Sequence, residues 1–292
     1  MSFPYLNETR ELNDITRMEA NDSFIALSDG MTHYQLSGDI HGAVVVMVHG
    51  FSTPYFVFDT PFDFLVRSGF RVLRYDLFGR GYSDRPHVNY DVHLFVRQLK
   101  ELLDALELQP VNLMSFSMGG PIGASFIDRY PGYVSKHILI DPAGARRIAL
   151  SILLEMTRLR GVGELALALF GNASLVRGIA KDMFTPQLIA QFQERYKVQM
   201  QYRGFKRAIL STMRNRMLDS FIETYERIGK LDIPTLLFWG KQDKTIPFED
   251  SIALCNAMPH AEFHAIENCG HLPHNERPEE VNPILLEFLL KG

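Results

Sequence analysis

The chain has little of several residue types and patterns, and each scarcity excludes a class of protein. Among its 292 residues are two cysteines, Cys255 and Cys269, whose spacing fits no metal or redox motif and permits at most one disulfide. No uninterrupted apolar run reaches the roughly 20 residues of a bilayer span, so we expect no stable membrane insertion. The amino-terminal MSFPYLNETRELNDITRME is too polar for a signal peptide. We therefore expect a cytoplasmic protein.

A strong excess of either charge is also missing. The chain has 30 Lys and Arg against 34 Asp and Glu, a formal net charge of −4. It lacks the basic balance typical of nucleic-acid binding, so we expect no nucleic-acid partner. A hydrophobic fraction of 46% with 22% charged residues is typical of a globular domain. The length suffices for one large α/β domain with an insertion.

Short apolar runs followed by turn residues predict strands, and longer stretches with helical spacing predict helices between them. Residues 23–37 predict a hairpin with its turn at 28–30. Further strands are predicted at 44–48, 71–75, 111–114, 137–140, 233–239 and 261–266. Helices are predicted at 91–106, 121–129 and 276–290. This alternation favours an α/β fold with a doubly wound, mostly parallel sheet.

Residues 144–229 break the alternation, because helical patterns follow one another there without a clear strand. The segment holds 14 Lys and Arg against 7 Asp and Glu, a net charge of +7, so the rest of the chain carries −11. We predict a helical cap inserted into one core, which consists of residues 1–143 and 230–292. The basic balance predicts an anionic substrate or transient contact with an anionic surface. Solvated helix faces explain the same arginines without a partner.

The segment VNLMSFSMGGPIG, residues 111–123, places Ser117 between a predicted strand and a predicted helix. A sharp turn there brings the strand and the helix close together, so the residues two positions away on each side must be small. Ser115 and Gly119 meet that demand. We therefore interpret Ser115 as a spacer and Ser117 as the nucleophile at the tip of the turn.

A serine hydroxyl needs a base that takes its proton, and the base needs a group that orients it. The segment WGKQDKTIP places Asp243 after the strand at 233–239, and ENCGHLPHNERPEE places His271 after the strand at 261–266. Both positions lie at the carboxyl edge of the predicted sheet, beside Ser117. We expect His271 to act as the base and Asp243 to orient it.

With these motifs the sequence resembles the α/β-hydrolase superfamily over nearly its whole length. The usual motif is G-x-S-x-G, and Ser115 stands here in place of the first glycine. The resemblance implies an eight-stranded sheet, the chain order Ser, Asp, His and no metal or cofactor. The segment VMVHGFS resembles the family's first-loop motif, which implies an oxyanion hole made by the amides of Phe51 and Met118.

Other residues compete for these roles. His274 is a rival base, and Asp141, after the strand at 137–140, is a rival acid because some relatives place the acid there. We expect His49 to hold the oxyanion loop by hydrogen bonding, and Asp76 to tie down the Gly-rich loop DLFGRGYSDRP. That loop lacks the spacing of a phosphate-binding motif.

We expect a mainly apolar pocket above Ser117. Phe51 and Phe116 are expected to flank the nucleophile, and Gly50 is expected in the pocket beside them. The cap residues that we expect to line the pocket, or else to pack the cap helices onto the core, are Met156, Leu167, Phe170, Met183, Phe184, Phe192, Met213 and Met217.

The leading interpretation is a serine hydrolase that cleaves small to medium apolar carboxylic esters through an acyl-enzyme on Ser117. A carbon–carbon bond hydrolase of the meta-cleavage-product type shares the SMGG motif, the Asp–His pair and a helical cap. The segment HGFSTPYFVFD lacks the glycine- and proline-rich oxyanion loop of those relatives. An acyltransferase or a ligand-binding protein on the same scaffold stays open, as does the oligomeric state.

Overall fold

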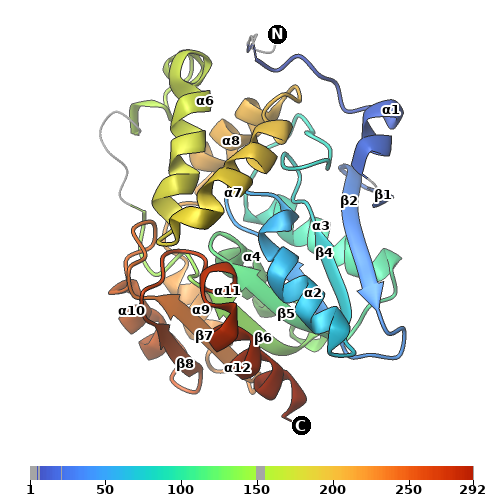
Figure 1. Ribbon diagram of the computed structural model, residues 1–292, viewed down its shortest axis with the longest axis vertical. Helices are drawn as coiled ribbons and strands as arrows, with labels where there is room; N and C mark the ends of the chain where they lie inside the picture. The colour runs from blue at the N-terminus through green and yellow to red at the C-terminus, as the bar shows by residue number, and fades with distance from the viewer. Residues whose placement is uncertain (1–4, 6, 21, 149–154, 292) are drawn as a thin grey trace.

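An eight-stranded sheet runs through the computed structural model (Figure 1), which describes residues 5, 7–20, 22–148 and 155–291. The strand order is β1-β2-β4-β3-β5-β6-β7-β8. The strands are β1 (Ser23–Leu27), β2 (Gly30–Gly38), β3 (Val44–Val48), β4 (Arg71–Tyr75), β5 (Val111–Phe116), β6 (Val134–Ile140), β7 (Thr235–Gly240) and β8 (Glu262–Ile266). Strand β2 pairs antiparallel with β1 and β4, and all other pairs are parallel. The predicted eight-stranded, mostly parallel fold is confirmed.

Helices surround the sheet. They are α1 (Asp14–Arg17), α2 (Asp59–Arg67), α3 (Val92–Ala105), α4 (Gly119–Arg129), α6 (Val162–Asp182), α7 (Pro186–Gln199), α8 (Phe205–Arg214), α9 (Ile222–Ile228), α10 (Asp250–Ala257), α11 (Pro273–Glu276) and α12 (Pro278–Leu290). Short 3-10 helices are η1 (Met18–Ala20), η2 (Tyr55–Phe58) and η3 (Pro131–Tyr133). Helix α3 begins at its cap Asp91, whose side chain accepts from the Leu94 amide at 3.0 Å.

Alternate residues of β3 show how the sheet divides the core. Val46 and Val48 face one side and Val45 and Met47 the other, and all four are completely buried. Side chains of α3, α4, α9 and α10 join the first cluster, and those of α2 and α12 join the second. The sheet is therefore covered on both faces, which explains why its central strands are continuous apolar runs.

Helices α6, α7 and α8 lie between β6 and β7 in the chain, pack against one another and stand above the sheet in Figure 1. The described part of the predicted cap, 144–148 and 155–229, adds no strand to the sheet. Helix α9, inside that range, packs on α4 and α10 beside the sheet. Residues 149–154 lie outside the described residues, and the division into core and cap stays a prediction.

Helix α2 is the main element that the sequence did not predict. Its buried Pro61, Phe62 and Leu65 have helical spacing. The four residues of η2 just before the helix are also buried and apolar. Their apolar run merges with the helical pattern of α2, so the start of the helix cannot be recognised from the sequence. Strand β5 also extends further than predicted, through Ser115 and Phe116, because the polar Ser115 is buried inside it.

Candidate active site

Ser117 stands at the sharp turn between β5 and α4. Its φ of 53° lies in the left-handed region, which favours glycine. Its amide donates to the carbonyl of Ile140 at 3.0 Å, and its own carbonyl accepts from the amides of Gly120 at 2.9 Å and Ala143 at 3.0 Å. These hydrogen bonds hold the serine in a conformation that the backbone alone disfavours.

The close approach of α4 to the sheet explains the small residues around Ser117. A Cβ atom on Gly119 would lie 2.2 Å from the carbonyl oxygen of Val48, and one on Gly123 would lie 2.3 Å from the Ser115 Oγ. Ser115 therefore fits where the usual motif has glycine because Gly123 opposite it has no side chain. Its hydroxyl contacts His137 Nε2 at 3.3 Å, away from the turn.

The structure brings Ser117, His271 and Asp243 together. His271 Nε2 lies 2.9 Å from Ser117 Oγ, and His271 Nδ1 lies 2.6 Å from Asp243 Oδ2. The other oxygen of Asp243 accepts from the amides of Thr245 at 2.7 Å and Ile246 at 2.9 Å. Since all three side chains are buried, the contacts are shielded from water. In this geometry Nδ1–H donates to the carboxylate and Nε2 is free to accept the serine proton.

His271 lies among several carboxyl groups. Its burial alone lowers its pKa, but the Asp243 carboxylate, with Asp141 and Asp182, outweighs burial and raises the pKa of His271 to about 9. The sequence did not single out Asp182, at the end of α6. The main-chain carbonyl of Asp182 accepts from the His271 amide at 2.7 Å and so fixes the histidine backbone.

The rival acid Asp141 is also at the site. It is completely buried, its Oδ1 accepts from the Gly240 amide at 2.8 Å, and ligand atoms of Asp141, Asp243 and His271 lie within 4.8 Å of one another. Burial and the neighbouring Asp243 carboxylate raise the pKa of Asp141 well above its ordinary value. Asp243 makes the hydrogen bond to the His271 ring and is its direct partner, whereas Asp141 lies behind this pair.

The rival base His274 has a different environment. Its Nε2–H donates to the carbonyl of Val57 at 3.0 Å, and its ring packs against Phe58 and Phe116. Complete burial lowers the pKa of His274 to about 3, so it stays neutral. His274 fixes the segment around η2, and His271 is the histidine that reaches Ser117.

Two amides next to Ser117 are free for a developing oxyanion. In the part of the chain that the structure describes, the N–H groups of Phe51 and Met118 donate to no protein acceptor. A Cβ on Gly50 would lie 3.0 Å from Ser117 Cβ, so the loop runs directly beside Ser117. As expected, His49 holds this loop: its Nδ1–H donates to the Gly50 carbonyl at 2.9 Å.

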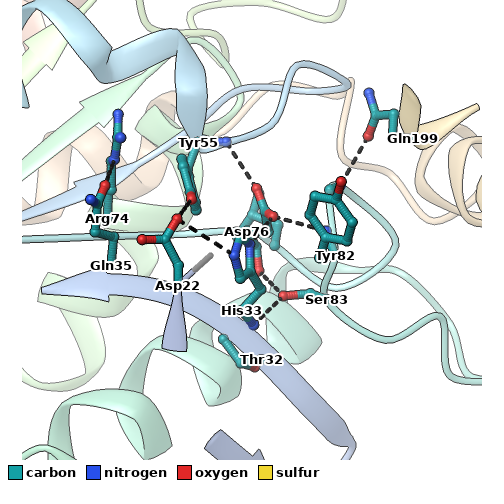
Figure 2. A network of polar contacts seen from close by, with 12 residues as sticks. Asp22, Thr32, His33, Gln35, Tyr55, Arg74, Asp76, Tyr82, Ser83 and Gln199 are labelled. Atoms are coloured by element: carbon teal, nitrogen blue, oxygen red, sulfur yellow. Dashed lines mark hydrogen bonds and ion pairs between the residues drawn. The ribbon is translucent and has the colours of Figure 1, made fainter. Parts of the chain in front are cut away.

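Two more buried residues, Arg80 and Asp76, form hydrogen bonds with the main chain of the segment that follows β3. Arg80, which the sequence did not point to, donates from Nε to the Phe51 carbonyl at 2.8 Å. Asp76 accepts from the amides of Tyr55 and Tyr82, each at 2.9 Å, and from His33 Nδ1 at 2.7 Å (Figure 2). Burial alone would raise the pKa of Asp76. These hydrogen bonds outweigh burial and hold the pKa of Asp76 below its ordinary range. Asp76 thus ties down its Gly-rich loop as predicted.

A cavity of about 700 Å³ opens beside Ser117 and His271. The predicted residues that line it are Gly50, Phe51, Phe116, Met183 and Phe192. The predicted residues that are not among its lining are Met156, Leu167, Phe170, Phe184, Met213 and Met217.

These residues lie away from the cavity for different physical reasons. Phe170 is 67% exposed on α6, one turn before Ser174, where the lining part of that helix begins. Phe184 is also exposed, and Met213 is buried in the apolar cluster on one side of the sheet. Helical spacing shows which residues share a face, but it does not show which face meets a cavity.

Four cations line the same cavity, namely Arg146, Arg147, Lys181 and Lys244. Arg146 is paired with Asp250 at 2.8 Å, and Arg147 is paired as well. Within the described ranges, Lys181 and Lys244 have no ion-pair partner. The cavity therefore has two cations without an ion-pair partner, in a mainly apolar wall that also contains the carboxyl groups of Asp182 and Asp250.

The sheet order, the strained serine and its histidine and aspartate partners define the class of α/β hydrolases. The family model described as alpha/beta hydrolase family matches residues 45–284. The chain belongs to this family, and the protein is a hydrolase.

Several known proteins are similar to the chain. The 2-hydroxy-6-oxo-6-phenylhexa-2,4-dienoate hydrolase of Burkholderia cepacia is 29% identical over 279 residues, 91% of this chain and 93% of that protein. The 2-hydroxy-6-oxononadienedioate/2-hydroxy-6-oxononatrienedioate hydrolase of Cupriavidus pinatubonensis is 26% identical over 282 residues, 91% of this chain and 94% of that protein. An esterase from Exiguobacterium antarcticum shares the fold, with a TM-score of 0.77 at 22% identity over 92% of this chain and 100% of the esterase.

Proposed function

We propose that the protein is a serine hydrolase in which Ser117 is the nucleophile, His271 the general base and Asp243 the residue that orients it. The 2.9 Å and 2.6 Å contacts of His271 support these roles. As Ser117 Oγ attacks a carbonyl carbon, its proton passes to His271 Nε2 and the carbonyl oxygen becomes an oxyanion. The free amides of Phe51 and Met118 stabilise that charge, and water later hydrolyses the acyl group from Ser117.

We propose further that the bond cleaved is a carbon–carbon bond beside a ketone, in a substrate that carries a carboxylate. The observation that carries this is the unpaired charge of Lys181 and Lys244 in the cavity of Ser117. A neutral ester gives these lysines nothing to bind, whereas a carboxylate complements them. The names of the relatives describe such substrates, with an acid at one end and a ketone at carbon 6.

The same residues account for cleavage of such a substrate. After the dienol tautomerises to its keto form, Ser117 adds to the ketone at carbon 6 and the bond to carbon 5 breaks. The departing electron pair is delocalised onto the carbonyl at carbon 2, and His271 returns the proton to the departing carbon. Water then releases the second acid from Ser117, so substrate and water become two acids with no redox change.

Ester hydrolysis is the second candidate, and one feature favours it. The oxyanion loop HGFSTPYFVFD departs from the glycine- and proline-rich loop of the carbon–carbon hydrolases. An ester carbonyl needs only the three side chains and two amides already described, with no tautomerisation step.

The deciding experiment compares turnover of 2-hydroxy-6-oxo-6-phenylhexa-2,4-dienoate, followed by loss of its dienone absorbance, with turnover of p-nitrophenyl butyrate. The proposal predicts that the wild type consumes the dienoate, releases benzoate and prefers the dienoate by kcat/KM. Ser117→Ala should lose both activities. Hydrolysis of the butyrate alone, still dependent on Ser117, would replace the carbon–carbon proposal with the ester one.

A further inference from the structure

The outer side of α6 carries an exposed row of large apolar side chains. Leu165, Leu169 and Phe170 are 54%, 64% and 67% exposed, and Val162 is exposed one turn earlier. Their spacing places them on one face of the helix. The opposite side of α6 packs against α7 and α8, and Figure 1 shows α6 at the outer edge of the molecule. We call Val162, Leu165, Leu169 and Phe170 the α6 outer face.

By length and composition alone, α6 is the one helix among the described residues that is long and apolar enough to cross a membrane. Glu164, Arg177 and Lys181 interrupt its apolar residues, so α6 reaches this length only by average hydropathy, and the absence of stable membrane insertion stays a prediction. One such helix is weak evidence for a span. Its packed inner side, where Glu164 bonds Arg214 at 2.6 Å, indicates a helix that lies on a surface.

Positive charge accompanies the α6 outer face. Exposed Arg160 precedes the helix, and Arg177 and Lys181 are exposed on the turns that follow the apolar row. The two acids of α6 point away from this face, because Glu164 is paired with Arg214 on the packed side and Asp182 lines the cavity, where its side chain accepts from Thr245. An apolar row bordered by unneutralised cations complements an anionic, partly apolar surface.

We propose that the α6 outer face docks onto the surface of a bilayer that contains anionic lipid. The leucines and Phe170 would enter the headgroup boundary while Arg160 and Arg177 contact lipid phosphates. A second copy of the chain fits less well. Antiparallel pairing of two α6 helices would bring Arg160 against Arg177, and parallel pairing would bring Arg177 against Arg177.

The position of α6 links this surface to the cavity. Leu175, Gly178 and Ile179, further along the same helix, line the cavity beside Ser117. Docking therefore places one wall of the cavity next to the lipid, which favours amphipathic acids that partition into membranes.

The test is cosedimentation with vesicles of phosphatidylcholine containing phosphatidylglycerol, compared with phosphatidylcholine alone. The wild type should bind the anionic vesicles more tightly, and salt should weaken the binding. Leu165→Glu/Leu169→Glu should lower partitioning by roughly tenfold or more. Arg160→Gln/Arg177→Gln should lower it by about fivefold for each charge removed. The control is Ile40→Glu, which changes an exposed apolar residue outside α6. This variant should bind the vesicles as the wild type does.

Two outcomes would overturn the proposal. One is no binding to anionic vesicles at low salt, or equal binding by the wild type and Leu165→Glu/Leu169→Glu. The other is a dimer that the leucine variant dissociates while vesicles are not bound, which would assign the face to a second copy. Neither leucine lines the cavity, so turnover of a short soluble ester should be unchanged. Ser117→Ala should bind vesicles as the wild type does, which separates this test from that of the proposed function.

Discussion

His271 faces three carboxyl groups, and each comes from a different part of the fold. Asp243 follows β7, Asp141 follows β6 and Asp182 ends α6. Of the three, Asp243 makes the hydrogen bond to the histidine ring. The electrostatic environment of the base is therefore set by the whole carboxyl edge of the sheet together with the helix above it.

The first prediction concerns the pH dependence of turnover. Only neutral His271 can take the serine proton, and neighbouring carboxylates raise the pKa of His271 to about 9. Activity is therefore low where the histidine is protonated and increases as pH rises through that pKa. We expect kcat/KM for p-nitrophenyl butyrate to rise with a midpoint above the ordinary histidine value of about 6.5. A flat profile, or one that falls across this range, would contradict the assignment of His271.

The second prediction separates the two aspartates. Asp243→Asn should lower kcat/KM by roughly 10³–10⁴-fold, because the histidine loses the charge that fixes its tautomer. Asp141→Asn should cost less than about tenfold, since the amide oxygen still accepts from Gly240 and Asp243 keeps its hydrogen bond to His271. Its pH midpoint should fall, because the contribution of Asp141 to the raised pKa of His271 is gone.

Steady-state kinetics of both variants at several pH values check this comparison, with thermal unfolding as a control for folding. If Asp141→Asn lost as much activity as Asp243→Asn, Asp141 would be the orienting acid, as in the rival interpretation.

At the scale of elements, the turn between β5 and α4 determines where Ser117, the proposed nucleophile, stands. Gly119 packs on the carbonyl of Val48 so closely that no Cβ fits. Gly119→Ala should therefore lower the free energy of unfolding by about 1–3 kcal/mol as strand and helix separate. Gly132→Ala, where nothing lies within 4 Å of the added atom, should change it by less than about 0.5 kcal/mol.

Urea denaturation of the two glycine variants measures this difference. Equal stability would mean that the turn relaxes without cost and that close packing does not dictate the small residues around Ser117.

The elements that the sequence predicts well are those whose burial is simple. Central strands such as β3 are buried on both faces and appear as apolar runs. Asp243 follows β7 and His271 follows the edge strand β8, and both could be placed from chain order. Helix α2 could not, because its own pattern merges with the apolar residues of η2. Arg80 and Asp182 were missed because each acts on the main chain of a distant residue, which leaves no local pattern.

At the scale of the whole molecule, the cavity joins core and cap helices that are far apart in the sequence. The positive balance of residues 144–229 indicated that cations would gather there, but it did not show which of them meet the cavity. Lys244 lies outside that range, after β7, and faces the same space as Lys181. Pairing decides which cations are available, and pairing depends on tertiary contacts such as that of Arg146 with Asp250.

The next prediction uses these cations. Lys181→Met/Lys244→Met should raise KM for the dienoate by roughly tenfold or more, since two charges that complement its carboxylate are removed. Turnover of neutral p-nitrophenyl butyrate should change little. Lys230→Met, at an exposed lysine that does not line the cavity, is the matched control and should affect neither substrate. Equal losses on both substrates would show that the lysines act on the fold and not on the carboxylate.

The most direct test of the account is covalent labelling by a fluorophosphonate, with the modified residue located by mass spectrometry of the peptides. The account predicts one adduct, on Ser117, absent in Ser117→Ala and formed far more slowly in His271→Ala. Ser115→Ala, two residues away, should label as the wild type does because its hydroxyl contacts His137 instead of His271. An adduct elsewhere, or labelling of Ser117 that proceeds at the same rate without His271, would contradict the claim that this histidine activates this serine.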